Sequence, residues 1–276
     1  MRVFSTSPAA AEWLGALGAE VALIGSEREG ELRRTDAGVD RLRETWPDLI
    51  VVGEETPGEA GYDLPGRGVQ PEVVVFAPQT FKQMLDAVLG LGRRIGRAAE
   101  AMALLAAAER RLAELHARIG LQKRTDPERL PSVVVLSSPV PLVVSGGWMP
   151  QLVELAGGRR VELATGGDAD AWASLCAADP DVVCLVPGEP GVGDAALRAF
   201  AARDGSNELS AVRGGRVYAF DDAHAFDRPG PRLYRAVELL AATLYPEPLA
   251  GLEPPIESWE RRALSEVAGL HVPNWS

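Results

Sequence analysis

Short, continuous apolar runs that follow helix-forming stretches constrain the fold of this chain more than any other feature. The clearest are residues 49–52 (Leu-Ile-Val-Val) and 181–186 (Asp-Val-Val-Cys-Leu-Val), and a Pro-Asp pair lies at the entry to each. Apolar runs without polar alternation are typical of parallel strands that helices bury on both faces. The sequence therefore predicts an α/β fold with mainly parallel sheets.

This pattern occurs once in each half of the chain, which predicts two similar, Rossmann-like α/β lobes. In the first half we expect strands at residues 2–5, 21–25, 49–52 and 73–76, and helices at residues 8–18, 36–46 and 80–90. In the second half we expect strands at residues 133–136, 142–144, 181–186 and 216–220. Helices are expected there at residues 150–156, 169–178, 193–203 and 231–244, with a short helical stretch near 258–267. Ser7 and Thr80 each precede a predicted helix and are expected to cap it.

One long helix is expected between the lobes. Residues 97–119 contain no helix breaker and are rich in the strongest helix formers, so they predict a helix about 35 Å long. We therefore expect an N-terminal lobe over residues 1–96, a rigid connecting helix over 97–120, and a C-terminal lobe with a tail over 121–276. Ligands of open α/β sheets bind beyond the carboxyl ends of strands, which predicts a cleft shared by both lobes.

Charge and composition exclude several classes of partner. The 276 residues include 28 basic and 39 acidic side chains, for a formal net charge of −11, which disfavours nucleic acid and anionic membrane surfaces. No apolar run approaches the roughly 18 residues of a membrane-spanning helix, so no membrane insertion is expected. The first residues lack the basic and apolar regions of a secretory signal. This predicts a cytoplasmic protein as written, or an extracytoplasmic one if a leader has been removed.

No catalytic constellation is evident, so the sequence predicts a binding protein and not an enzyme. The three histidines form no i, i+4 pair and there is no Cys-x-x-Cys, so no metal site is expected. The two cysteines, Cys176 and Cys184, are interpreted as inert thiols, buried by default. The glycines in residues 90–96 lie between helical stretches instead of after a strand, which excludes a dinucleotide-binding loop. An enzyme that uses a nucleotide would need such a loop.

Several loop residues have two interpretations each. Ser5–Ser7 follow the first strand and could bind an anion at the helix N-terminus or only cap that helix. Trp148 follows a Ser-Gly-Gly turn, where the ring could fill the core or form a flat wall for a ligand. His224 lies among aspartates, as an ion-pairing or a ligand-contacting residue.

Two segments resemble a known family. Residues 145–158 (Ser-Gly-Gly-Trp-Met-Pro-Gln-Leu-Val-Glu-Leu-Ala-Gly-Gly) and residues 226–232 (Phe-Asp-Arg-Pro-Gly-Pro-Arg) resemble segments of helical-backbone (class III) substrate-binding proteins. Within that class, the closest resemblance is to the cobalamin-binding proteins of ABC importers, and it extends over residues 2–246. It implies two lobes joined by a rigid helix, a corrinoid between them, and an ABC permease as partner.

The resemblance also implies where the corrinoid would lie. Trp148 and Phe226 take the positions of cleft residues, and Gly147 replaces the histidine that usually precedes the tryptophan, so any bond from that histidine is lost. Asp227 falls where a family member can carry a glutamate that meets the permease, and Glu55 and Glu59 are the matching candidates on the first lobe. The full set of expected ligand-binding residues is Ser5, Thr6, Ser7, Gly53, Glu54, Tyr62, Trp148, Met149, Phe220, His224, Phe226 and Arg228.

Alternatives to cobalamin remain within the same fold. They are a receptor for a siderophore, haem or a metal ion, and an intracellular member with an altered ligand. We expect no cofactor apart from the ligand. Because a single helix joins the lobes, only small motion is expected on binding.

Overall fold

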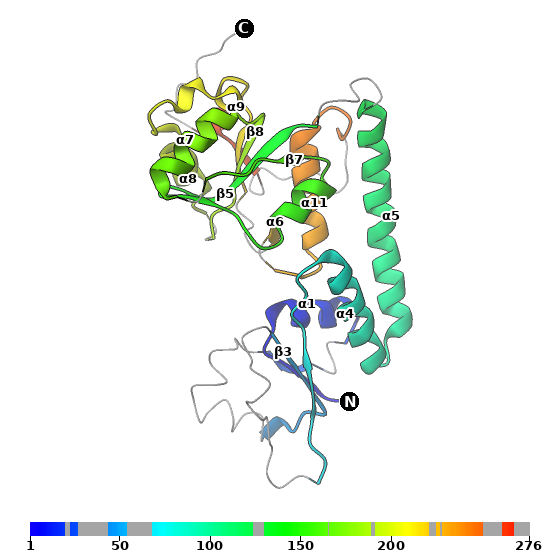
Figure 1. The fold of residues 1–276 in the computed structure, drawn as a ribbon. Coiled ribbons are helices and arrows are strands. Elements are labelled where there is room, and N and C mark those ends of the chain that lie inside the picture. The colour runs from blue at the N-terminus through cyan, green and yellow to red at the C-terminus, as the bar shows by residue number, and fades with distance from the viewer. Residues whose placement is uncertain are drawn as a thin grey trace. The chain divides into compact units, whose positions relative to one another are not determined.

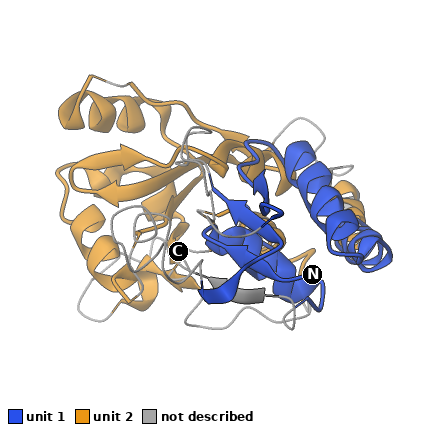
Figure 2. Ribbon diagram, turned by 90° about the horizontal axis from the view of Figure 1, so that it is seen from below, with its two compact units in different colours: residues 1–110, 229–231 blue, residues 111–228, 232–276 orange. Residues whose placement is uncertain are grey.

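The computed structural model describes residues 1–19, 23–26, 44–53, 68–123, 130–164, 166–188, 191–220, 225–226, 228–250 and 261–267. The chain divides into two compact units, one of residues 1–110 with 229–231 and one of residues 111–228 with 232–276 (Figure 2). The division falls inside helix α5 (Ala98–Lys123), whereas the sequence predicts lobe limits at the two ends of that helix.

The first unit is built on a four-stranded sheet with strand order β2-β1-β3-β4, and all its pairings are parallel. Its strands are β1 (Val3–Ser5), β2 (Leu23–Ser26), β3 (Leu49–Val52) and β4 (Glu72–Val75). Every residue of β1 and β3 is buried, which explains the continuous apolar sequence of β3. By contrast, β4 is an edge strand, and Val73 and Val75 are exposed.

Two capped helices belong to the first unit. Helix α1 (Pro8–Ala16) begins after Ser7, whose hydroxyl accepts a hydrogen bond from the backbone of Ala10. Helix α4 (Phe81–Arg94) begins after Thr80, whose hydroxyl accepts one from the backbone of Gln83. Both caps are confirmed, because a hydroxyl before the first turn satisfies backbone groups that the helix leaves free.

A glycine fixes how closely α4 and α5 approach each other. A Cβ atom on Gly92 would lie 2.7 Å from the Cβ of Ala101, closer than two carbon atoms can come. This glycine therefore lies within α4 and allows α5 to pack closely against it, so it is not part of a phosphate-binding loop after a strand.

The second unit is built on a six-stranded sheet with strand order β10-β9-β8-β5-β6, in which β7 also pairs with β5. Its strands are β5 (Ser132–Pro139), β6 (Leu142–Val144), β7 (Arg159–Arg160), β8 (Val182–Leu185), β9 (Val217–Phe220) and β10 (Arg261–Ala263). Strands β5, β7, β8 and β9 run parallel, whereas β6 and β10 are antiparallel to their neighbours. The predicted α/β fold with mainly parallel sheets is thus confirmed.

Helices cover both faces of this second sheet (Figure 1). One face is packed by α7 (Asp168–Ala178), α8 (Gly193–Ala201) and α9 (Ser210–Arg213), and the other by α6 (Met149–Leu155) and α11 (Leu233–Leu244). The first face holds a core around Leu136, Leu175 and Phe200, each 0% exposed. On the second face, a Cβ atom on Gly158 would lie 2.9 Å from the Cδ1 atom of Leu244, so any larger residue would require the neighbouring side chains to move.

The tail differs from its prediction. Residues 258–267 are predicted to be helical, but residues 261–263 form β10 and residues 264–266 a 3-10 turn (η2, Leu264–Glu266). Arg261–Ala263 pair with Tyr218–Phe220 of β9. The edge of β9 supplies backbone partners that a local helix pattern does not reveal, and the tertiary pairing therefore overrides the propensity.

Other differences concern short elements. The structure contains three short elements that were not predicted from the sequence: β7, α9 and the 3-10 turn η1 (Ser206–Glu208). Of the helix predicted at 36–46, residues 36–43 lie outside the described part of the chain.

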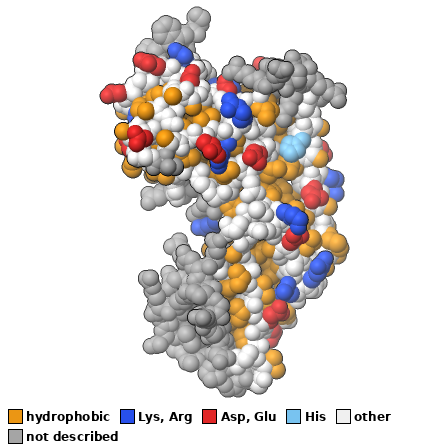
Figure 3. Space-filling view, in the orientation of Figure 1, with side chains coloured by type: hydrophobic (Ala, Val, Ile, Leu, Met, Phe, Trp, Pro, Cys, Tyr) orange, Lys and Arg blue, Asp and Glu red, His pale blue; other side chains and the backbone are white. Residues whose placement is uncertain are grey.

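No helix among the described residues is long and apolar enough to cross a membrane. On the face shown in Figure 3, acidic and basic side chains are interspersed instead of gathered by sign.

Candidate functional site

The carboxyl ends of β1 and β3 bring Ser5–Ser7 and Gly53 to one edge of the first sheet. The Ser5 hydroxyl donates to the carbonyl of Ser7 at 2.9 Å and accepts from its backbone N–H at 3.2 Å. The Ser7 hydroxyl caps α1. The geometry therefore confirms the helix cap, and a contact of this segment with a ligand stays a prediction. The Thr6 hydroxyl is buried and has no hydrogen-bond partner.

The predicted residues of the second unit are mostly buried. Trp148 is 8% exposed and Met149 4%, at the start of α6. Phe220 and Phe226 pack against each other with ring centroids 5.1 Å apart, and both are buried. Arg228 is half-buried. These side chains offer little surface in this structure, and their part in ligand binding stays a prediction.

The strand pairing shows where the segment before Trp148 lies in the sheet. The strand that precedes it, β6, runs antiparallel to β5, and the backbone N–H of Ser145 donates to the carbonyl of Val135. Val144, the last residue of β6, pairs with Leu136 of β5. Leu136 also pairs with Leu185, the last residue of β8, so β6 ends level with the carboxyl end of that parallel strand. The remaining predicted residues lie outside the described part of the chain, namely Glu54, Glu55, Glu59, Tyr62, His224 and Asp227.

A pocket of about 600 Å³ lies at the β6 edge of the second sheet. We call it the hairpin pocket, because the β5–β6 hairpin forms one wall and the segment from β7 to the first turns of α7 forms the other. It is lined by Pro141, Leu142, Val143, Val144, Ser145, Gly146, Arg160, Val161, Glu162, Leu163, Ala164, Gly167, Asp168 and Ala171. All of these residues belong to the second unit.

The hairpin wall is apolar and accessible. Val143 is 45% exposed and Val144 37%, whereas Leu142 is 6% exposed and packs into the core. An edge strand has a neighbouring strand on one side only, so its side chains have fewer neighbours on the faces of the sheet than those of a central strand. Exposed valines beside a concave surface are a feature of small-molecule sites, which are mostly apolar with a few polar groups.

Polar groups occupy defined places in the hairpin pocket. The Ser145 hydroxyl is buried without a hydrogen-bond partner, and Arg160 forms an ion pair with Glu162. Asp168 accepts a hydrogen bond from the backbone N–H of Leu142 at 2.5 Å. A hydrogen bond from Arg203, followed by that of Leu142, lowers the pKa of the Asp168 carboxyl below its ordinary value. Asp168 is thus a carboxylate held in place, not a general acid.

The cysteines agree in chemistry with the sequence analysis but not in burial. Burial raises the pKa of the Cys184 thiol to about 12, so this side chain is inert at neutral pH. Cys176 is exposed, although it was expected to be buried, and partial desolvation also raises its pKa. Among the described residues, no group of three or more His, Cys, Asp or Glu side chains could hold a metal ion.

Sequence reasoning missed this pocket although it predicted the strand at 142–144. The apolar run indicates a strand, but nothing local shows that the strand is antiparallel and at an edge. The one available signal is the Pro-Val-Pro turn at residues 139–141, which is typical of a reversal of the chain.

Comparison with known proteins identifies the family. A model of the family described as periplasmic binding protein matches residues 31–223, more than half of the chain. The chain belongs to this family, whose members bind solutes and are not enzymes. Among curated proteins, none matches this sequence.

Solved structures share the fold. A periplasmic heme-binding protein from Pseudomonas aeruginosa has a TM-score of 0.67 and 23% identity, covering 89% of this chain and 92% of that chain. A possible iron-binding periplasmic solute-binding protein from Staphylococcus epidermidis has a TM-score of 0.66 and 19% identity, covering 88% and 98%. An ABC-type Fe³⁺-hydroxamate transport protein from Saccharomonospora viridis has a TM-score of 0.56 and 20% identity, covering 88% and 93%.

Proposed function

We propose that this protein is the solute receptor of an ABC importer and that its solute is haem, with a ferric siderophore as the second candidate. The family match supports a solute receptor. The similar solved structures include a heme-binding protein, a possible iron-binding protein and part of an Fe³⁺-hydroxamate transport system. They favour the haem and siderophore alternative over cobalamin, which the sequence resemblance implies.

The observation that carries the haem proposal is the combination of groups around the hairpin pocket. Haem is a flat apolar ring with two carboxylates on one edge. The exposed Val143 and Val144 offer an apolar wall for the ring. Arg160 offers a cation for a carboxylate, which would compete with Glu162 for the guanidinium. The hydroxyl of Ser145, another lining residue, has no hydrogen-bond partner in the folded chain. The cavity of about 600 Å³ is within the usual range of small-molecule sites.

A ferric hydroxamate siderophore would use the pocket differently. Its surface is richer in oxygen, so it would gain more from Arg160 and Ser145 and less from the valines. The apolar wall therefore ranks haem first, and the similarity to a hydroxamate transport protein keeps the siderophore as the alternative.

The test is a titration of the purified protein with hemin, with a ferric hydroxamate chelate and with cobalamin, each followed by absorbance. We expect saturable binding of hemin at micromolar or lower concentration. Val143→Asp, which places a charge on the apolar wall, should weaken hemin binding about tenfold. The matched control is Val140→Asp, since Val140 is 56% exposed on the same hairpin but does not line the pocket.

Each outcome of the titrations tests one part of the proposal. Saturable binding of the chelate alone would replace haem by the siderophore, and binding of cobalamin alone would restore the corrinoid. Equal effects of the two aspartate variants would remove the hairpin pocket as the site. Folded protein that binds none of the three ligands would overturn the proposal.

The location and the importer partner are part of the same proposal. Family members act outside the cytoplasm, which supports an extracytoplasmic location. We propose that Glu55, Glu59 and Asp227 dock an ABC permease. Their replacement by alanine should reduce the ATPase stimulation of a reconstituted importer without changing hemin affinity, and unchanged stimulation would exclude these residues.

A further inference from the structure

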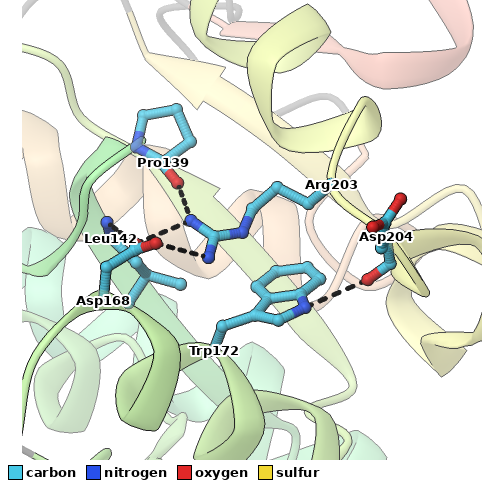
Figure 4. A network of polar contacts seen from close by, with 6 residues as sticks. All are labelled: Pro139, Leu142, Asp168, Trp172, Arg203 and Asp204. Carbon is cyan, nitrogen blue, oxygen red and sulfur yellow. Dashed lines mark hydrogen bonds and ion pairs between the residues drawn. The ribbon is translucent and has the colours of Figure 1, made fainter.

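Arg203 lies behind the hairpin pocket, and its side chain contacts both walls of the pocket. Arg203 follows the end of α8, and its side chain is 11% exposed. Its Nη1 atom donates to the carbonyl of Pro139 at 2.7 Å and to Oδ1 of Asp168 at 2.8 Å. Its Nη2 atom donates to Oδ2 of Asp168 at 3.0 Å (Figure 4). The guanidinium therefore joins the β5–β6 hairpin to the first residue of α7.

Asp168 links Arg203 to the lining of the hairpin pocket. Its carboxylate accepts from Arg203 and also from the backbone N–H of Leu142, which begins β6. Asp168 and Leu142 line the hairpin pocket, whereas Arg203 does not. Arg203 thus holds a lining carboxylate, and that carboxylate holds the backbone of the opposite wall.

The guanidinium is itself held from the other side. Its central carbon lies 4.4 Å from the ring centroid of Trp172, a cation–π contact. The indole N–H of Trp172 donates to the carbonyl of Asp204 at 3.0 Å, and the ring packs edge-on against the buried Phe200. Figure 4 shows the guanidinium between the indole ring and the Asp168 carboxylate.

We infer that Arg203 is a positioning residue for the ligand pocket, which sets the distance between the hairpin and the start of α7. The inference rests on the proposed function, because it takes the hairpin pocket as the ligand site. Arginine is suited to this role, since its planar fork binds a carboxylate with two parallel bonds and still reaches a third acceptor. Lysine carries the same charge but lacks that geometry.

The experiment compares Arg203→Lys, Asp168→Asn and the double variant by two measurements. The first is hemin affinity, and the second is amide hydrogen exchange at Leu142. Each single variant should weaken hemin binding about tenfold, because small displacements of a supporting contact loosen the whole site. If Arg203 acts through Asp168, the double variant should bind no more weakly than the weaker single variant. Exchange at Leu142 should become faster in all three.

A control separates positioning from general stability. Asp179, at the other end of α7, accepts bonds from the backbone and the hydroxyl of Ser210 at 2.7 and 2.6 Å. Asp179→Asn therefore removes a comparable contact in the same unit, away from the pocket. It should lower the melting temperature about as much as Arg203→Lys, with hemin affinity and Leu142 exchange unchanged.

The outcomes are distinct. Additive effects in the double variant, or exchange at Leu142 unchanged by Arg203→Lys, would overturn the inference. Equal hemin affinity of Arg203→Lys and Asp179→Asn would overturn it as well. If the wild-type protein binds no hemin, the proposed ligand fails, but the exchange at Leu142 still decides whether Arg203 positions the hairpin. If Arg203→Lys does not fold, the exchange in Asp168→Asn decides it.

Discussion

The turn at Ser5–Ser7 in the first unit and the hairpin pocket in the second unit are built differently. The turn follows a buried parallel strand, and its two serine hydroxyls are used in local hydrogen bonds. The hairpin lies at an antiparallel edge, where Val143 and Val144 stay exposed. A central strand that is covered on both faces hides its side chains, whereas an edge strand leaves some of them accessible, as β4 also does in the first unit.

The two regions also differ in charge. The turn is held by neutral hydroxyl and backbone groups, and its helix packs through the buried Trp13. The hairpin pocket is held by Arg203, Asp168 and the Arg160–Glu162 pair. We therefore expect the turn to respond to loss of packing, and the hairpin pocket to respond to pH.

Loss of Trp13 should have the largest effect. Trp13 is 1% exposed, and its indole N–H donates at 2.7 Å to the carbonyl of Pro229, which belongs to the same unit. Trp13→Ala should reduce the free energy of unfolding by about 4 kcal/mol, because it leaves a large cavity. Trp172→Ala, which removes the ring that packs against Arg203, should cost about 2 kcal/mol, since Trp172 is only half-buried. Urea unfolding measures both, and equal losses would contradict the contrast.

Removal of the Ser7 cap should have a smaller effect. Ser7→Ala leaves the backbone of Ala10 without its acceptor and should reduce the free energy of unfolding by about 1 kcal/mol. Thr80→Ala, which removes the corresponding cap of α4, is the matched comparison. If Ser7→Ala abolishes hemin binding with little change in stability, the turn is a ligand site after all and the contrast fails.

Replacement of Thr6 should raise stability. The Thr6 hydroxyl is buried without a partner, and valine has nearly the same shape without the polar atom. Thr6→Val should therefore increase the free energy of unfolding by up to about 1 kcal/mol. Thermal melting measures this gain. A loss of stability would show that the hydroxyl does have a role in the folded chain.

The smallest effect should be on the change of the melting temperature at acidic pH. The pKa of Asp168 is lower in the folded chain than its ordinary value of 3.8, so the unfolded chain binds the proton more readily. The stability from the Arg203–Asp168 pair is therefore complete above the ordinary value and is lost as the pH falls through the lowered pKa. Asp168→Asn should flatten the decline of the melting temperature over this range. Ser7→Ala should leave that slope unchanged, and a wild-type slope in Asp168→Asn would contradict the assignment.

The sequence by itself determined the parallel strands and the helix caps. Residues 49–52 and 182–185 form buried strands because a parallel strand covered on both faces must be apolar throughout. Ser7 and Thr80 cap their helices because a capping hydroxyl acts within three residues. Such features depend on neighbours in the chain, and a single sequence contains them.

Only the tertiary structure decided the rest. The direction of β6, the pairing of β10 with β9 and the contact of Arg203 with Asp168 join residues that are distant in the sequence. An apolar run of three residues has the same composition at a parallel and at an antiparallel edge. The hairpin pocket is therefore a product of strand order, which depends on how the whole unit buries its apolar surface and pairs its backbone.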